Sequence, residues 1–368
     1  SGLNEYRTYY GLTLDQPLAR GAGRAATMAP IEMARADVRA ASARAVDAVA
    51  GVVASALAGY LDLRLAQEQL VMWDGGLEMA RRLLEEARRL ADEGRLPETA
   101  VLDVESSLLR YEAGQNGALQ NHRAAMNRLR SLLMASARAD ALRIEAVDAL
   151  PSVERVDSDL EDVLAAALAQ RPDFVAGREE VEKREVAVEL ARNRMRPQLD
   201  LIAAYGVEGL EDDFYSGATD FRSIGDQPQF SVGLEFSMPV GVNQQGRAEL
   251  ARAELELHKA QVALQALEVS IANDLDTSLA AVRTHYEQWN RFQRILEAEE
   301  RLLESERSLL AAGRADMRNV LTRQEVVMNA RNAVLAERVA YAKARIALAL
   351  SRGVLPERYG FAAEAPAG

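Results

Sequence analysis

Apolar and polar residues alternate strictly from Phe230 to Met238. Apolar side chains occupy every second position of this run, and serine, glycine or glutamate lies between them. Period-two alternation predicts a β-strand with one apolar and one polar face. Residues 5–14 and 198–208 show the same alternation. The sequence therefore predicts three strands of this kind.

The other long segments have helical periodicity. Apolar residues recur at i, i+3, i+4 and i+7 in the stretch that begins at Pro30 and ends near residue 93, and residues 246–312 contain no proline. Each stretch would span roughly 100 Å at about 1.5 Å per residue. Typical helices have only about 11 to 12 residues, so these helices do not suit an ordinary compact domain.

A short turn joins each long helix to a return helix. Gly94 suits the left-handed conformation that ends many helices, and Pro97 suits the first turn of the next helix. The first return helix is predicted over residues 97–133. A second turn at residues 313–315 precedes a second return helix, predicted over residues 316–351.

The two halves of the chain repeat each other. The segment RRLLEEARRLADEGR, which ends at Arg95, aligns with ERLLESERSLLAAGR, which ends at Arg314, at an offset of 219 residues. The repeated unit is a strand, a long helix, a turn and a return helix. A helix and a strand at residues 173–208 precede the second unit. We expect their counterparts in the first unit to lie before residue 1, so that the chain is truncated at its N-terminus.

Composition agrees with a helical protein and excludes several classes. Aromatic residues are only 5% of the chain, whereas alanine, leucine, arginine and glutamate dominate. The net charge of −12 argues against nucleic acid as a partner. The chain has no cysteine, which excludes disulfides and thiolate metal sites. No uninterrupted run of 18 apolar residues occurs, so no transmembrane helix is predicted.

No arrangement of residues predicts catalysis. His122, His258 and His285 lack metal-ligand spacing. Residues 21–26, GAGRAA, match a dinucleotide-binding pattern, but the helix of some sixty residues that follows prevents a compact βαβ unit. We therefore predict no enzyme, no cofactor and no metal.

Strand length favours a membrane barrel. Residues 198–208 would cover roughly 25 Å at ~3.3 Å per residue and ~45° tilt, which is the apolar height of an outer-membrane barrel. A barrel in lipid must close, and so few strands require several copies of the chain. A water-soluble sheet with one buried face is the alternative, and the long helices favour the barrel.

Charged residues gather at the two hairpin turns. Either they only solvate the helix ends, or they form a charged constriction that holds a pore closed beside grooves for a partner. These tip residues are Asp92, Glu93, Gly94, Arg95, Glu98 and Asp103 at the first turn, and Gly313, Arg314, Asp316 and Arg318 at the second.

Four segments resemble the TolC-like outer-membrane efflux family. They are ALAQRPDF at 167–174, RNRMRPQLDLIAAYG at 192–206, QPLARGAGR at 16–24 and MPVGVNQQGR at 238–247. The resemblance implies a mainly α fold with a small membrane β-barrel portion. Long α-helical hairpins would form a trimeric α-barrel, continued by a shared 12-stranded β-barrel.

The resemblance also implies a function. The chain would be the passive exit duct of a tripartite efflux or type I secretion system. It would act as a homotrimer in the outer membrane of a Gram-negative-type bacterium, with most of the chain in the periplasm. Its partners would be a periplasmic adaptor (membrane fusion) protein, an inner-membrane pump and outer-membrane lipid. The alternative is a soluble coiled-coil periplasmic scaffold or adaptor, although an adaptor would have a single long hairpin flanked by β-rich domains.

By the same resemblance, the strands have a lumen face and a lipid face, and the tips lie at the periplasmic entrance. The residues expected in the barrel lumen are Arg7, Thr13, Asp200, Ser231, Glu235 and Ser237. The residues expected to face lipid are Tyr10, Leu12, Leu199, Leu201, Tyr205, Phe230, Val232, Leu234 and Phe236.

The expected segments follow this plan. They are a barrel strand at 4–17, a first helical hairpin in the periplasmic tunnel at 24–134, an equatorial connector at 135–172, an upper helix at 173–195, a barrel β-hairpin at 196–240, a second helical hairpin at 241–351 and a C-terminal tail at 352–368.

Overall fold

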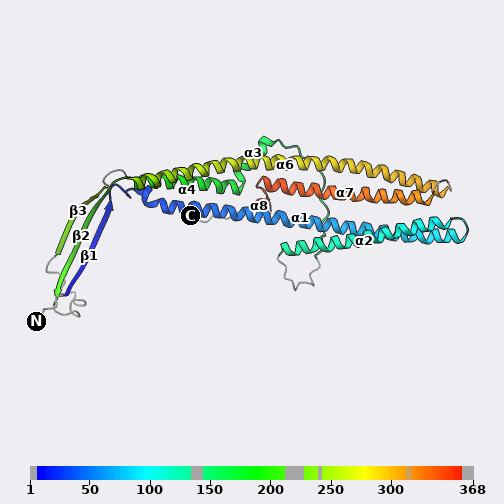
Figure 1. Cartoon of the computed structure of the whole chain (residues 1–368), viewed down its shortest axis with the longest axis horizontal. Helices are drawn as coiled ribbons and strands as arrows, with labels where there is room; N and C mark the ends of the chain where they lie inside the picture. The colour runs from blue at the N-terminus through cyan, green and yellow to red at the C-terminus, as the bar shows by residue number, and fades with distance from the viewer. Residues whose placement is uncertain are drawn as a thin grey trace. The chain divides into compact units, whose positions relative to one another are not determined.

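The computed structural model describes residues 6–133, 144–211, 228–238, 243–312, 314 and 316–358. The chain forms two compact units, residues 1–43 with 174–267 and residues 44–173 with 268–368. The described elements are β1 (Tyr6–Pro17), α1 (Arg24–Asp92), α2 (Glu98–Leu132), α3 (Leu160–Gln170), α4 (Pro172–Arg194), β2 (Gln198–Glu211), β3 (Pro228–Ser237), α6 (Gln244–Ala311), α7 (Met317–Ser351) and α8 (Leu355–Arg358) (Figure 1).

The two halves of the chain carry matching elements. In the first half, a 12-residue strand precedes helices of 69 and 35 residues. In the second half, a 10-residue strand precedes helices of 68 and 35 residues. The order and lengths therefore agree with the repeat seen in the sequence.

The first long helix begins earlier than its proline suggests. The sequence predicts a start at Pro30, but α1 begins at Arg24 and Pro30 lies inside it. The carbonyl of Gly23 accepts the backbone N–H of Thr27 at 3.2 Å and its hydroxyl at 3.1 Å, which closes the first turn. Proline costs the helix one hydrogen bond there, and a helix of this length tolerates that loss. The predicted start was wrong by six residues.

The turn between α1 and α2 has the geometry that Gly94 predicts. Gly94 has a positive φ of 71°. The N–H groups of Arg95 and Leu96 donate to the carbonyl of Leu90 at 2.9 and 3.1 Å, so the turn satisfies the end of α1. Pro97 is the N-cap of α2, one residue before its predicted place in the first turn.

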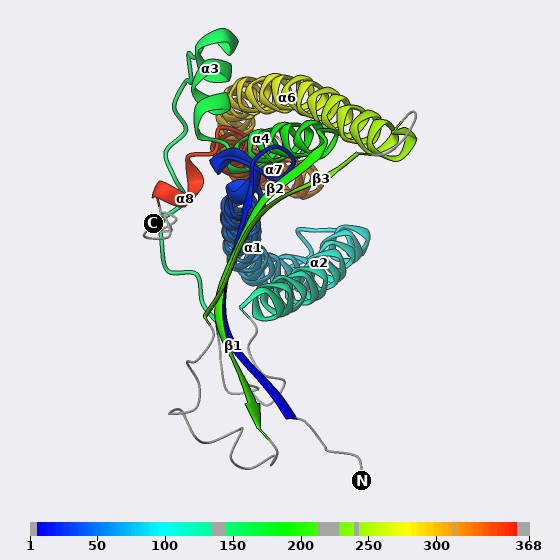
Figure 2. The ribbon, with the colours of Figure 1, turned by 90° about the vertical axis from the view of Figure 1, so that its left-hand side faces the viewer.

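The compact unit of residues 1–43 and 174–267, called the first unit below, contains an antiparallel sheet in the order β1-β2-β3 (Figure 2). Tyr205 is the Cα partner of both Leu12 and Phe230, which fixes the register of all three strands. The middle strand, β2, has 14 residues and is longer than the predicted segment 198–208. Among the described strands, β1 and β3 each pair only with β2, so each leaves one edge open.

In the second unit, the hairpins pack through separate apolar clusters. Leu84 and Val104 of the first hairpin cluster with Met317 and Leu321 of α7. Leu303 of α6 packs against α7 in another cluster, with Val320 and Val327. Helix α7 therefore contacts both α6 and the first hairpin.

The RPD sequence at residues 171–173 fastens the end of α7. Arg171 pairs with Asp173 at 2.6 Å and donates to the backbone carbonyl of Ser351 at 3.2 Å. The hydrogen bond to Asp173 raises the pKa of the Arg171 guanidinium. Burial, and the nearby charge of Asp173, raise the pKa of the Asp47 carboxyl. The motif therefore has a structural role at the end of the second hairpin.

Two glycines admit large aromatic rings between α1 and α2. A Cβ at Gly114 would lie 2.1 Å from Cζ3 of Trp73, and a Cβ at Gly76 would lie 2.7 Å from Cε1 of Tyr111. The two rings meet edge to face with centroids 6.0 Å apart. Tyr111 is almost fully buried and clusters with Met328 of α7. The glycines thus allow an aromatic cluster to join the first hairpin to the second.

We expect Gly114→Ala to destabilise the protein by about 1 to 3 kcal/mol, because the methyl group displaces the Trp73 ring from a packed site. Thermal or urea unfolding of the purified protein measures the effect. Gly117→Ala is the matched control on the same helix, since nothing lies within 4 Å of its added Cβ. Gly117→Ala should stabilise the helix by about 0.5 to 1 kcal/mol. Equal effects of the two substitutions would contradict the packing argument.

One described helix is apolar enough to cross a membrane by length and composition. An 18-residue window of α1 has a mean hydropathy of 1.5, and 22% of it is buried inside the chain. The sequence predicted no such helix because charged residues interrupt every apolar run. The window therefore leaves apolar surface that the chain itself does not cover, including Val49 and Val52.

Candidate functional site

The sheet of the first unit has one continuous apolar face. Leu199 is the partner of Phe236, Leu201 of Leu234, and Tyr205 of Phe230. All nine residues predicted to face lipid lie on this face by register. Most are strongly exposed, with Leu12 at 81% and Phe230 at 72%. A face of this size and composition indicates contact with another apolar surface.

The opposite face carries the polar positions. Thr13 is aligned with Ala204 and Ser231, and Asp200 is aligned with Glu235. All six residues predicted to face the lumen share this face by register, although for Arg7 only the backbone position is described. Asp200 differs from an open lumen residue, since it is only 7% exposed and accepts a hydrogen bond from Gln198 at 2.6 Å.

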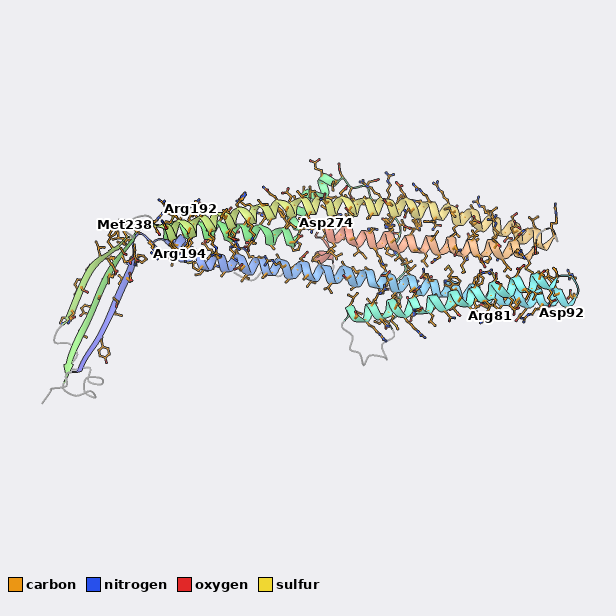
Figure 3. The ribbon with its side chains drawn as sticks, in the orientation of Figure 1. Arg81, Asp92, Arg192, Arg194, Met238 and Asp274 are labelled. Carbon is orange, nitrogen blue, oxygen red and sulfur yellow. The ribbon has the colours of Figure 1, made fainter. Side chains whose placement is uncertain are left out.

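The predicted tip residues separate into a local group and a connecting pair. Asp92 lies at the end of α1 (Figure 3). Glu93 pairs with Arg95 at 3.1 Å and with Arg89 at 3.5 Å, all within the first turn. Glu98 is the first residue of α2. The contacts of Glu93 are therefore local to the first hairpin.

The second turn is described only in part. Asp316 caps α7 by accepting the N–H of Arg318 at 3.4 Å. The N–H of Arg314 donates to the carbonyl of Leu309 at 2.8 Å. Gly313 lies outside the described residues.

Asp103 and Arg318 join the two hairpins. The Nε and Nη2 atoms of Arg318 lie 2.9 and 2.5 Å from Oδ2 of Asp103. The hydrogen bond to Asp103 raises the pKa of the Arg318 guanidinium. The sequence placed these residues at different tips, and the structure brings them together across 215 residues of chain.

A second connection lies one heptad further along the same helices. Arg110 of α2 donates to Glu325 of α7 at 3.0 and 2.9 Å, and to the buried hydroxyl of Ser107 at 2.6 Å. This pair was not predicted from the sequence. A signal was available in the sequence. Asp103 and Arg110 are seven residues apart on α2, and Arg318 and Glu325 have the same spacing and the opposite charges on α7.

The outer face of α2 is a further surface that the sequence analysis missed. At the repeat offset of 219, Leu102 and Leu109 correspond to Leu321 and Met328 of α7. The α7 pair is buried against the first hairpin, at 4% and 7% exposure. The α2 pair is 58% and 61% exposed. A shallow groove, here called the α2 seam, is lined by these two leucines and by Glu105, Ser106, Arg110 and Ala113.

Nothing in the described part of the chain forms a metal site of three or more histidine, aspartate or glutamate residues. His122 lies on α2, and His258 and His285 lie on α6. Nδ1 of His285 contacts Oε2 of Glu337 at 2.8 Å. His285 therefore takes part in a contact between α6 and α7.

The comparisons with known proteins identify the family of this chain. Residues 163–354, more than half of the chain, match the family model of outer membrane efflux proteins. The chain belongs to this family, which confirms the resemblance to TolC-like proteins. It is an outer-membrane efflux channel component, and the channel proteins of this family are not enzymes. The alternative of a soluble scaffold or adaptor is therefore wrong.

Solved structures share the fold at low sequence identity. The Campylobacter jejuni CmeC outer membrane channel has a TM-score of 0.73 and 15% identity, covering 98% of this chain and 82% of that one. Vibrio cholerae VceC has a TM-score of 0.72 and 15% identity, covering 95% and 87%. The open state of the Neisseria gonorrhoeae MtrE channel has a TM-score of 0.69 and 16% identity, covering 96% and 81%. A comparison with curated protein sequences finds no match.

Proposed function

We propose that three copies of this chain assemble into a passive exit duct across the outer membrane and the periplasm. The strands of the three copies form a shared barrel in lipid, and the long hairpins form an α-helical tunnel below it. The three described strands per copy account for nine strands, so a twelve-stranded barrel needs one further strand from each copy. The proposed duct is one part of a tripartite efflux or type I secretion system.

The sheet carries this proposal. Its apolar face is exposed in the single chain, and both outer strands leave backbone hydrogen-bonding groups at an open edge. Open edges are not tolerated in hydrocarbon, where each unpaired backbone group costs several kcal/mol. Pairing of β1 and β3 with the further strands, and through them with neighbouring copies, satisfies these edges. Closure then turns the apolar face outward to lipid and the face with Thr13 and Glu235 inward.

The internal repeat supports the assembly of the helices. Leu321 and Met328 of α7 are covered by the first hairpin of the same chain. The corresponding residues of the α2 seam, Leu102 and Leu109, remain mostly exposed in the described chain. The second hairpin (α6 and α7) of a neighbouring copy fits this surface. The repeat gives the interface between copies the same helical elements as the interface between the two hairpins of one copy. Alternation of the two hairpin types then closes a ring.

We expect Leu102→Glu combined with Leu109→Glu to weaken each contact between copies by about 3 kcal/mol or more, since two apolar side chains lose their burial. Light scattering after gel filtration, with detergent subtracted, measures the mass. Leu133→Glu combined with Val147→Glu is the matched control, because both residues are also exposed, at 57% and 80%. The seam variant should shift toward monomer and the control should not. A seam variant that keeps the full trimer mass would contradict the assignment of this surface.

The hairpin ends are the proposed periplasmic entrance. The ion pairs Asp103–Arg318 and Arg110–Glu325 fasten α2 to α7 near these ends. We propose that they hold the entrance closed, and that Asp92, Glu93, Gly94, Arg95, Glu98, Gly313, Arg314 and Asp316 surround the surface where a periplasmic adaptor docks. An inner-membrane pump supplies the energy through that adaptor.

The deciding measurement for the whole proposal is the mass of the unmodified protein in detergent. A discrete trimer is the expected result, because only several copies can pair all strand edges. A monomer that stays soluble without detergent would overturn the duct.

A further inference from the structure

The connector at residues 144–159 runs along the helices of the second unit and is held by their side chains. The hydroxyl of Tyr60 donates to Oδ2 of Asp148 at 2.9 Å, and the N–H of Asp148 donates back to that hydroxyl at 3.0 Å. Arg338 of α7 donates to the carbonyls of Leu150 and Pro151 at 2.6 and 3.0 Å. The connector is thus fastened to α1 on one side and to α7 on the other.

A cavity of about 270 Å³ lies beneath this connector. Most of its wall is apolar and comes from four segments, namely α1, the connector, α7 and α8. The apolar wall includes Leu57, Leu61, Leu150, Ile346, Ala349 and Leu355. The volume is below the 300 to 1,000 Å³ of pockets for drug-sized ligands, so the cavity suits a smaller molecule. It lies entirely within one copy of the chain.

Two arginines line the cavity with hydrogen-bonding capacity unused. Arg345 makes no ion pair in the described chain, and its guanidinium carbon lies 6.0 Å from the centre of the Tyr341 ring. Arg64 pairs with Glu68 and with the carbonyl of Ala146, but its buried Nε has no acceptor. Asp148 is the acidic residue in the wall, and it already accepts the hydrogen bond from Tyr60.

We infer that this cavity is a binding site for a small amphipathic carboxylate. The apolar wall takes the hydrocarbon part, and the carboxylate accepts hydrogen bonds from Arg345 and from Nε of Arg64. Arginine binds carboxylate through paired N–H groups, and such charge-assisted hydrogen bonds are the strong ones. The unpaired groups in the wall, on Arg345 and Arg64, are hydrogen-bond donors. An acidic head group can accept from them, and a protonated amine cannot.

Binding also connects this cavity to the hairpins. The same ligand contacts α1, α7 and the connector, so its binding favours the arrangement in which all three are together. None of the tip residues lines the site, and the site does not depend on assembly into a trimer.

The test is calorimetric titration of the full-length protein in detergent, with blank titrations into detergent alone. Phenylbutanoate is the probe, and phenylbutylamine is the control with the same hydrocarbon part and opposite charge. We expect phenylbutanoate to bind with a stoichiometry of one per chain and phenylbutylamine to bind at least about tenfold more weakly. Equal binding of the two probes, or no binding of phenylbutanoate at millimolar concentration, would overturn the inference.

Two variants locate the site. Arg345→Met keeps the apolar stem and should weaken phenylbutanoate at least about tenfold, while Arg128→Met, an exposed substitution on α2, should leave it unchanged. Ala349→Leu fills the cavity and should abolish binding while the far-ultraviolet circular dichroism and the mass in detergent stay those of the unmodified protein. An Arg345→Met protein that binds normally overturns the site. Because the mass is recorded for every variant, failure of the binding site is distinguishable from failure of the trimer.

Discussion

Replacing Leu234 by arginine should prevent stable insertion of the protein into lipid. Leu234 lies near the middle of β3, is aligned with Leu201 of β2, and is 68% exposed on the apolar face. An arginine near the midplane of a membrane barrel costs about 2 to 4 kcal/mol. Three copies would multiply that cost in a trimer. The yield of folded protein in lipid vesicles and its unfolding in urea measure the loss.

The control for this substitution is the neighbouring residue. Glu235→Arg introduces the same side chain on the opposite face, beside Asp200. We expect it to assemble normally, because it replaces a like-charge neighbour of Asp200 with an opposite charge. Equal loss at both positions would show that the apolar face does not contact lipid. Loss only at Glu235 would reverse the assignment of the two faces.

Asp103→Ala should open the proposed channel. Arg318 loses its partner on α2, so one of the two ion pairs between α2 and α7 disappears. The pair is solvent-exposed, so one copy contributes modestly, but three copies together should raise the open fraction by about one order of magnitude. Current through single trimers in planar lipid bilayers is the measurement, and the effect should weaken at high salt, which already screens the pair.

Two further variants make this result specific. Glu112→Ala removes a similarly exposed ion pair with Arg81 that lies within the first hairpin (Figure 3), and it should leave the current unchanged. Exchanging the charges, with Asp103→Arg and Arg318→Asp together, should restore the closed state. A closed Asp103→Ala channel would show that this pair does not hold the entrance.

The extent of prediction from sequence differs between the sheet and the tips. The phase of the strands follows from local alternation, so the sequence alone assigns Phe230 and Leu234 to one face. The left-handed turn at Gly94 is equally local. The start of α1 was less predictable. Proline usually marks the first turn of a helix, but a helix of this length tolerates Pro30 in its interior. The burial of Asp200 and its hydrogen bond from Gln198 were not visible in the alternation.

Contacts between the halves were the least predictable. Asp103 and Arg318 are 215 residues apart, and nothing local indicates that they meet. The repeat aligns α2 with α7 but does not state that the two helices pack on each other. The cavity beneath the connector depends on four segments at once, so the sequence of none of them indicates it.

The two ion pairs between α2 and α7 also restrict how the proposed entrance can open. The pairs are seven residues apart on both helices, and their charges are reversed. In the first pair the acid, Asp103, is on α2, whereas in the second pair the base, Arg110, is on α2. If one helix slid along the other by a heptad, either Arg318 would meet Arg110 or Glu325 would meet Asp103. Both encounters bring like charges together. Axial sliding is therefore opposed by the charge order itself, whereas sideways separation of the two helices brings no like charges together.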